Sequence, residues 1–174
     1  MEKRLDSVAD ADAAAEWLAR TGWADGRRIA CMGGSYGGFM VLSCLTEYPA
    51  RWAAGVDLYG VANFLTFFEH TAPWRRAHRA AEYGSPERDR ALLERISPIH
   101  RVDRIRAPLY VFHGANDPRV PIEETEQIVG ALHTRGVPVE YFRSEDEGHG
   151  ITRLTNRLAV YPAIAAFLDK HLGR

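Results

Sequence analysis

Cysteine is scarce in this sequence, and no long uninterrupted apolar stretch occurs in it. The two cysteines, Cys31 and Cys44, lie in apolar segments. They suit small buried side chains better than a disulfide framework or a zinc site. Without about 20 consecutive apolar residues the sequence predicts no membrane span, and the first 20 residues lack the apolar core of a signal peptide. We therefore expect a cytoplasmic protein.

A surplus of charge of either sign is also missing. The 22 Lys and Arg residues nearly balance the 23 Asp and Glu residues, which leaves a net charge of −1. No overall field would attract the protein to nucleic acid or to an anionic membrane. Hydrophobic residues make up 46% of the 174 residues, enough for the core of one domain. Specificity must therefore come from a local site.

Short β-rich apolar stretches alternate with longer helical patterns, and the sequence contains no repeat or low-complexity segment. This alternation predicts an α/β fold with a parallel sheet. The predicted strands cover 28–32, 53–58, 108–113 and 139–142, and the predicted helices cover 7–20, 36–47, 123–133 and 156–171. Pro162 should kink the last of these helices or restart it.

Between the second and third predicted strands lies a segment rich in arginine and aromatic residues, from about 59 to 106. Turn-forming residues interrupt it at Pro73, at 84–86 and at 97–98, so we expect an irregular excursion with one short helix over 87–95. We expect this excursion to cap the sheet edge near the functional site.

The sequence Gly33-Gly34-Ser35-Tyr36-Gly37 fits the pattern G-x-S-x-G between a predicted strand and a predicted helix. In that context the pattern predicts a nucleophile elbow, a sharp turn that holds the serine in a strained conformation. Gly33 and Gly37 would remove side chains that collide across the turn. The backbone N–H of Tyr36 and the positive end of the helix would stabilise an oxyanion.

A serine hydroxyl needs a histidine to accept its proton and an acid to orient that histidine. In folds with this elbow the chain order is serine, acid, histidine. Asp117 follows a predicted strand and would share the sheet edge with Ser35. Asp103 would lie at the opposite edge, and Asp146 is too near the candidate histidine in sequence. We therefore predict that Asp117 is the acid.

Of the seven histidines, four precede Asp117. His133 lies in a helical pattern, and His171 lies in the last turn of the chain. His149 follows the last predicted strand in a loop with a glycine on each side, which would let the imidazole reach Ser35. We predict that His149 is the base.

Three segments together resemble the catalytic-domain motifs of the prolyl oligopeptidase family, particularly its acylaminoacyl-peptidase and dipeptidyl-peptidase-like members. They are GGSYGGFM at 33–40, HGANDPRVPI at 113–122 and DEGHG at 146–150. The resemblance extends over almost the whole chain. It implies an α/β-hydrolase fold with helices on both faces of the sheet, and it implies Ser35, Asp117 and His149 as nucleophile, acid and base.

The resemblance also implies a pocket for a substrate side chain. The matching positions are Tyr36, Tyr59, Phe64 and Val120, although aromatic residues packed under a cap are core residues more often than ligand contacts. Arg119 is a candidate for holding a substrate carbonyl or carboxylate. Arg75 and Arg76 are candidates for receiving a peptide terminus, whereas most such arginines form surface ion pairs.

Family members carry strands before the nucleophile, a loop that supplies a second oxyanion donor, and an N-terminal β-propeller. The resemblance does not match these parts to any residues of this sequence. We therefore expect an open sheet edge beside the strand at 28–32, with possible self-association, and weak catalysis by this chain alone.

The predicted activity is hydrolysis of short or acylated peptides through an acyl-enzyme, with no metal or cofactor. A carboxylesterase is one alternative, because the three residues do not distinguish amide from ester substrates. A catalytically incomplete assembly module is another.

Overall fold

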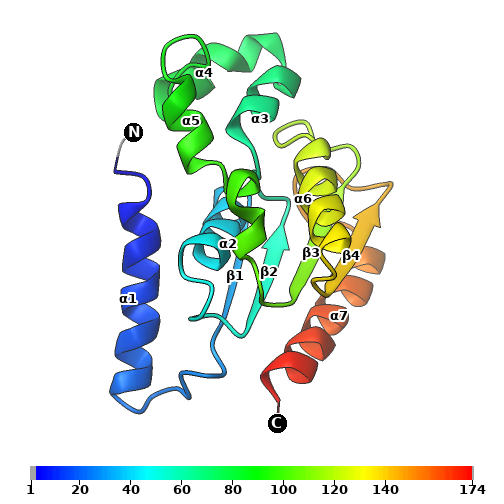
Figure 1. Cartoon of the computed structure of the whole chain (residues 1–174). Coiled ribbons are helices and arrows are strands. Elements are labelled where there is room, and N and C mark those ends of the chain that lie inside the picture. Colours follow the sequence, from blue (N-terminus) through cyan, green and yellow to red (C-terminus); the bar gives the residue numbers. More distant parts are fainter. Residues whose placement is uncertain (1–2, 174) are drawn as a thin grey trace.

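The computed structural model describes residues 3–173. Within these residues helices alternate with four strands (Figure 1). The elements are α1 (Asp6–Arg20), β1 (Ala30–Gly34), α2 (Tyr36–Glu47), β2 (Ala54–Leu58), α3 (Phe64–His70), α4 (Pro73–Tyr83), α5 (Arg90–Ile96), the 3₁₀ helix η1 (Pro98–Arg104), β3 (Leu109–Gly114), α6 (Glu123–Thr134), β4 (Val139–Ser144) and α7 (Leu154–Leu172).

All four strands are parallel, in the order β1-β2-β3-β4. Gly34 pairs with Leu58 at the end of β1, and Gly114 pairs with Ser144 at the end of β4. Each predicted strand is present, although β1 begins two residues later than expected. Because the strands are parallel, the loops that follow them meet at one edge, where ligands bind in open α/β sheets.

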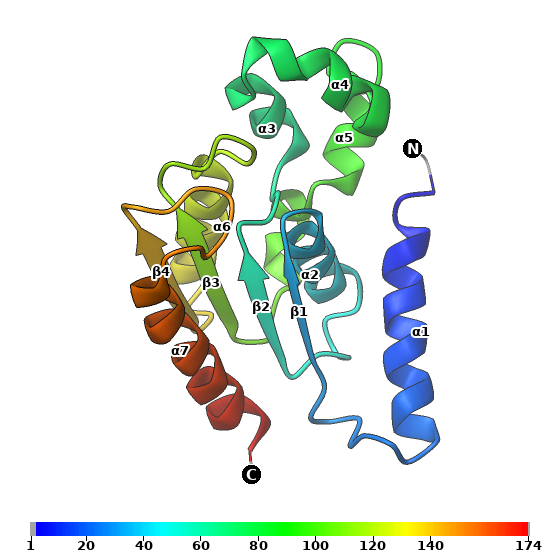
Figure 2. The same cartoon turned by 180° about the vertical axis from the view of Figure 1, so that it is seen from behind.

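Alternating side chains of β2 and β3 divide between the two faces of the sheet, as the pleat requires. Val56 and Phe112 pack with α7 on one face, whereas Val111 packs with α2 and α6 residues on the other. Figure 2 shows α7 on the near face of the sheet and α2 and α6 behind it. This agrees with the predicted α/β-hydrolase fold, with helices on both faces.

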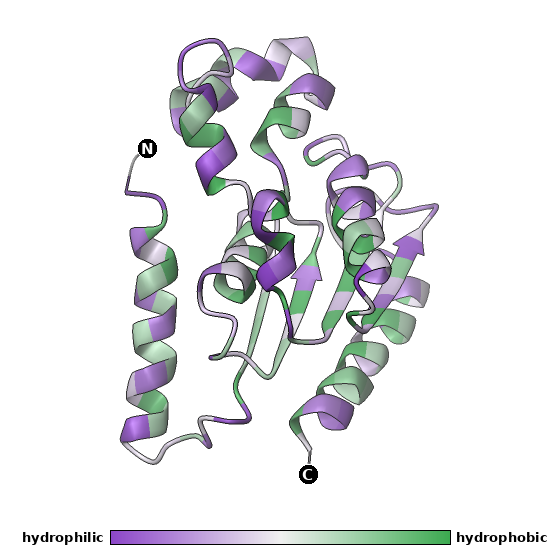
Figure 3. Cartoon of the chain, in the orientation of Figure 1, coloured by the Kyte–Doolittle hydropathy of each residue, from purple (hydrophilic) through white to green (hydrophobic). Residues whose placement is uncertain are grey.

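Helix α1 lies against α2 through an apolar stripe that includes the buried residues Val8 and Ala15. Its hydrophobic and hydrophilic bands alternate along the ribbon (Figure 3). This spacing is that of an amphipathic helix, so the predicted first helix is confirmed. No helix in the part of the chain that the structure describes is long and apolar enough to cross a membrane.

The segment after β2 is largely helical, and the prediction of an irregular excursion with one short helix was wrong. Helices α3, α4 and α5 gather beyond the carboxyl ends of the strands (Figure 1). Pro73 and Pro98 each occupy a first turn, in α4 and η1, where the missing N–H costs nothing. These two prolines therefore begin helices and do not interrupt them. At the start of α3, the side chain of Asn63 accepts a hydrogen bond from Leu65 N and caps the helix.

Helix α7 continues from Leu154 to Leu172 without a break, so Pro162 does not restart it. Proline removes one donor from the helix, and the carbonyl left without a partner belongs to Leu158, four residues earlier. Leu158 is 68% exposed, and Pro162 is exposed as well. Water can therefore take the place of the missing donor.

Candidate active site

Ser35 occupies a strained turn between β1 and α2. Its φ of 59° and ψ of −120° lie in a backbone region that residues other than glycine rarely adopt. The Ser35 N–H donates to the carbonyl of Leu58 at 2.9 Å, which fixes the turn against β2. A side chain at Gly33 would come within 2.4 Å of the Gly37 carbonyl oxygen. The sequence and the strain both fit a nucleophile elbow.

The expected reason for a glycine at position 37 was wrong, because a Cβ atom there would meet nothing within 4 Å. The close approach falls at Gly38 instead. A Cβ atom at Gly38 would lie 2.2 Å from Asp57 Oδ1 and 2.6 Å from the Cα atom of Gly60. The first turn of α2 thus packs directly on the loop after β2, which leaves no room for a side chain.

The structure brings Ser35, Asp117 and His149 into one hydrogen-bonded chain. His149 Nε2 lies 2.9 Å from Ser35 Oγ, and His149 Nδ1 lies 2.6 Å from Asp117 Oδ2. A carboxylate only accepts, so Nδ1 carries the proton and the lone pair on Nε2 faces the serine hydroxyl. The Asp117 side chain is fully buried and that of His149 is 13% exposed. Chemically, this arrangement can remove a proton from Ser35.

Asp117 receives hydrogen bonds on both carboxylate oxygens. Its Oδ1 accepts from the backbone N–H groups of Arg119 at 2.7 Å and Val120 at 3.0 Å. Burial alone would raise the pKa of Asp117, but hydrogen bonds from His113, His149 and these two N–H groups hold it below its usual range. The carboxylate therefore stays ionised beside His149.

His113 supports the acid, and the sequence prediction missed this residue. Its imidazole is fully buried at the end of β3, with Nε2 at 3.0 Å from the Val120 carbonyl and 3.5 Å from Asp117 Oδ2. Its Nδ1 lies 2.7 Å from Thr125 Oγ1. Its position between a predicted strand and the turn that ends in Asp117 was the sequence feature that could have identified His113. What its ring contacts depends on the fold.

Glu147 fastens the loop that carries His149 and was also missed. It is 1% exposed, and its carboxylate accepts from Thr152 N at 3.0 Å, Arg153 N at 2.8 Å and Asn156 Nδ2 at 3.0 Å. Its backbone carbonyl accepts from Asn116 N at 3.0 Å, on the loop of the acid. One residue therefore connects the loops of Asp117 and His149 with the start of α7.

The residues expected to line a substrate pocket divide into two groups. Phe64 is fully buried, and Val120 is 2% exposed within the same apolar cluster, so the structure does not support direct substrate contact by either. Tyr59 has a φ of 48°, and its ring centroid lies 4.7 Å from that of His149. Arg119 is exposed beside Asp117. Tyr59 and Arg119 thus lie next to the three central residues.

Tyr36 is the first residue of α2, so its N–H has no carbonyl within the helix to pair with. Its ring stacks on Tyr83 of α4, with centroids 6.4 Å apart, and lies 5.2 Å from Phe39. The role of its N–H as an oxyanion donor stays a prediction.

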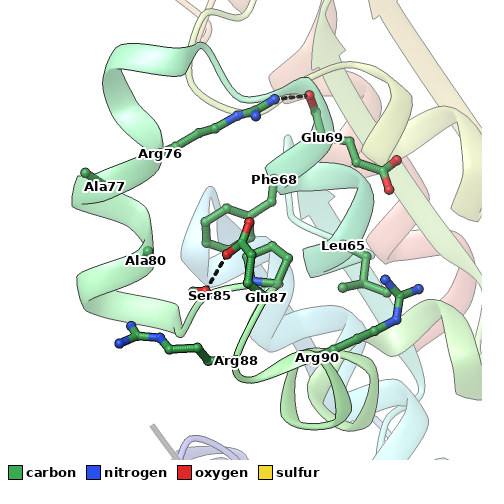
Figure 4. Close-up of a pocket in the computed structure, with 11 residues that line it drawn as sticks. Leu65, Phe68, Glu69, Arg76, Ala77, Ala80, Ser85, Glu87, Arg88 and Arg90 are labelled. Atoms are coloured by element: carbon green, nitrogen blue, oxygen red, sulfur yellow. Dashed lines mark hydrogen bonds between the residues drawn. The ribbon is translucent and has the colours of Figure 1, made fainter.

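A separate cavity of about 550 Å³ opens within the cap formed by α3, α4 and α5. Leu65 and Phe68 line it together with charged side chains such as Arg76 and Arg88 (Figure 4). Neither Ser35, Asp117 nor His149 lines this cavity. It is therefore distinct from the site at the sheet edge.

The profile of the prolyl oligopeptidase family matches residues 2–174. This chain belongs to the prolyl oligopeptidase family. Dipeptidyl aminopeptidase BIII of Pseudoxanthomonas mexicana is 39% identical over 98% of the chain. The rat acylamino-acid-releasing enzyme is 26% identical over 95% of it. The family resemblance stated from the three motifs is confirmed.

Solved structures agree with this membership. A puromycin-hydrolyzing peptidase of Mycobacterium tuberculosis matches 95% of the chain with a TM-score of 0.89 and 31% identity. An acylaminoacyl peptidase of Pyrococcus horikoshii matches the fold with a TM-score of 0.82. The chain spans about a quarter of the length of these relatives, 25% of the Pseudoxanthomonas enzyme and 25% of the mycobacterial one.

Proposed function

We propose that this chain carries the catalytic centre of a serine peptidase that cleaves short peptides through an acyl-enzyme. The observation that carries the proposal is the connected pair of hydrogen bonds from Ser35 through His149 to Asp117, at 2.9 Å and 2.6 Å. The strained backbone of Ser35 supports it, because strain of this kind persists where the surrounding structure holds a nucleophile in place.

The reaction follows from this geometry. Nε2 of His149 takes the proton of Ser35 Oγ as that oxygen attacks the carbonyl carbon of the substrate. The N–H of Tyr36 and the positive end of α2 stabilise the oxyanion. The carbon–nitrogen bond then breaks as His149 returns the proton to the leaving amine, and water repeats the cycle on the ester. Asp117 orients the ring and stabilises its charged form.

The names of the relatives support peptides as the substrate class. Those with at least 30% identity include a dipeptidyl aminopeptidase and a puromycin-hydrolyzing peptidase. The three residues by themselves do not distinguish amide from ester substrates. Comparing the hydrolysis of peptide nitroanilides with that of nitrophenyl esters separates the two substrate classes.

A fluorophosphonate probe tests the nucleophile. We expect the probe to label Ser35, and Ser35→Ala to lower peptide hydrolysis by at least about a thousandfold. Ser43→Ala is the matched control, because Ser43 is a buried serine on α2 with no hydrogen bond to the three residues. Unchanged labelling of the Ser35→Ala variant, with its fold intact by circular dichroism, would contradict the proposal.

A further inference from the structure

Helix α4 turns two arginines toward the candidate active site. Arg75 and Arg79 are four residues apart and therefore lie on one face of the helix. Arg76 is engaged elsewhere, because its guanidinium donates to the carbonyls of Glu69 and Thr71 at the rim of the cap cavity (Figure 4). The same helix therefore offers a pair of arginines on the active-site side and a control arginine that is bound to the backbone of the cap.

Arg79 lies against the aromatic cluster that reaches Tyr36, the residue after the nucleophile. Its guanidinium carbon is 5.3 Å from the ring centroid of Phe67 and 5.8 Å from that of Tyr83, the ring that stacks on Tyr36. The side chain is 15% exposed, and its Nε is buried with no hydrogen-bond partner among residues 3–173. A buried donor without a partner costs free energy unless a ligand supplies an acceptor.

Arg75 reaches the loop of the acid. Its Nη1 donates to the carbonyl of Pro118 at 3.4 Å, next to Asp117. Partial burial is the main cause that lowers the pKa of Arg75, and the charges of Arg79 and Arg119 lower it further. The two α4 arginines thus extend from the aromatic cluster that reaches Tyr36 to the residues beside Asp117.

Positive groups gather here from three separate segments. The guanidinium carbon of Arg4 lies 5.2 Å from the Tyr36 ring and 4.7 Å from the Tyr83 ring, and Arg119 follows the acid. The neighbouring carboxylates are already engaged. Asp117 is hydrogen-bonded to His149, and Glu82 lies 3.9 Å from Arg79. Like charges four residues apart destabilise a helix, and an anion between them would relieve this repulsion.

We propose that Arg75 and Arg79 bind a carboxylate of the substrate, so that the enzyme prefers peptides with an acidic side chain or a free C-terminal carboxylate near the cleaved bond. This inference rests on the proposed function and names the substrate class of that site. Arginine suits the role because its planar guanidinium presents two parallel donors to a carboxylate.

The binding test uses the Ser35→Ala variant and fluorescent peptides in matched pairs, so that it does not depend on hydrolysis. One pair differs by Glu against Gln, at each position flanking the cleaved bond in turn. Another differs by a C-terminal acid against an amide. The pair that shows a preference identifies the source of the carboxylate. We expect the acidic member to bind roughly tenfold more tightly, as one charged hydrogen bond implies.

Replacing the arginines should remove this preference. Arg75→Gln and Arg79→Gln should bring the ratio of the two affinities close to one, Arg79→Lys should retain part of it, and Arg76→Gln should leave it unchanged. The preference in the unsubstituted protein should also shrink as salt rises from about 0.05 to about 0.5 M, because salt screens the attraction between the arginines and an approaching carboxylate. If the glutamine variants do not fold, this salt dependence tests the inference, and a preference that does not change with salt would contradict it.

Equal binding of every acidic and neutral pair would overturn the inference, as would a preference that survives in both glutamine variants. Hydrolysis of the same peptides by the unsubstituted protein, which retains Ser35, separates the two proposals. Turnover of neutral peptides without any acidic preference leaves the peptidase proposal standing and rejects the carboxylate site. Selective binding without turnover rejects the peptidase proposal alone.

Discussion

At the scale of single residues, the position of His149 depends on the residue two places before it. The Glu147 carboxylate accepts several hydrogen bonds from the first residues after the loop, and its backbone connects to the loop of Asp117. Burial alone would raise the pKa of Glu147, but hydrogen bonds from Thr152, Asn156 and the Arg153 N–H lower it to about 2. The group therefore remains an ionised anchor at every pH at which the enzyme would work.

We expect Glu147→Ala to lower kcat by about 10²-fold or more with little change in KM, because it releases the loop that aims the imidazole at Ser35. Glu147→Gln keeps one oxygen for the backbone donors and should restore most of the activity. Kinetics of both variants on a peptide nitroanilide provide the measurement. Equal losses in the two variants, or a loss explained entirely by a lower Tm, would show that Glu147 has no positioning role.

At the scale of elements, the contact between α2 and the loop after β2 decides how firmly Ser35 is held. Gly38 and Gly60 approach so closely that a Cβ atom at Gly60 would lie 2.5 Å from Asp57 Oδ1 and 2.6 Å from the carbonyl carbon of Gly38. Both elements begin at the carboxyl edge of the sheet. Their separation therefore sets the position of the helix end beside the nucleophile.

Gly38→Ala should destabilise the protein by about 2–4 kcal/mol and slow phosphonate labelling of Ser35, because the methyl group forces α2 away from β2. Gly37→Ala, one residue earlier in the same helix turn, should leave stability unchanged or raise it by up to about 1 kcal/mol, since its Cβ meets no atom. Urea unfolding of the two variants compares them directly. Similar destabilisation by both would contradict this account of the packing.

The cap is attached to the sheet by a second buried carboxylate. Glu124 at the start of α6 accepts from the N–H groups of Ala62 at 3.0 Å and Asn63 at 2.7 Å. Burial raises the pKa of Glu124 to about 7, although these hydrogen bonds act in the opposite direction. Helix α3 thus begins from a loop that α6 fixes, which positions the aromatic cluster under the cap.

At the scale of the whole molecule, Asp57 makes stability depend on pH. The residue is fully buried in β2, its Oδ1 accepts from Gly60 N at 2.9 Å, and its Oδ2 is buried without a partner in the described part of the chain. Burial raises the pKa of Asp57 from 3.8 to about 7, against the smaller effects of His113 and the Gly60 N–H. The stabilisation from the neutral carboxyl is complete below about pH 4 and is lost as pH rises through 7.

Asp57→Asn should remove this dependence. From pH 4 to pH 8 the free energy of unfolding of the variant should rise relative to that of the unsubstituted protein by roughly 4 kcal/mol, the equivalent of the shift in pKa. Urea unfolding at a series of pH values gives this difference. A constant difference across the range would mean that Asp57 ionises in the folded protein as it does in the unfolded chain.

The sequence by itself determined the four strands, the helices outside the cap and the chain order of the serine, the acid and the histidine. Periodicity predicted the four strands and the main helices to within a few residues, since each of these patterns depends on neighbours in the chain. The glycines around Ser35 and the order of serine, acid and histidine were sufficient to select three residues that the structure brings together. The three segments 33–40, 113–122 and 146–150 together identified the family.

Only the tertiary structure decided the rest. Phe64 and Val120 were expected at a pocket and are core residues, because burial depends on what the cap packs against. His113, Glu147 and Gly38 were missed, since their partners come from other elements. Ser35 and His149 are separated by 114 residues, and His149 and Asp117 by 32. Contacts at such separations depend on how the sheet and the cap assemble, which no local pattern in the sequence records.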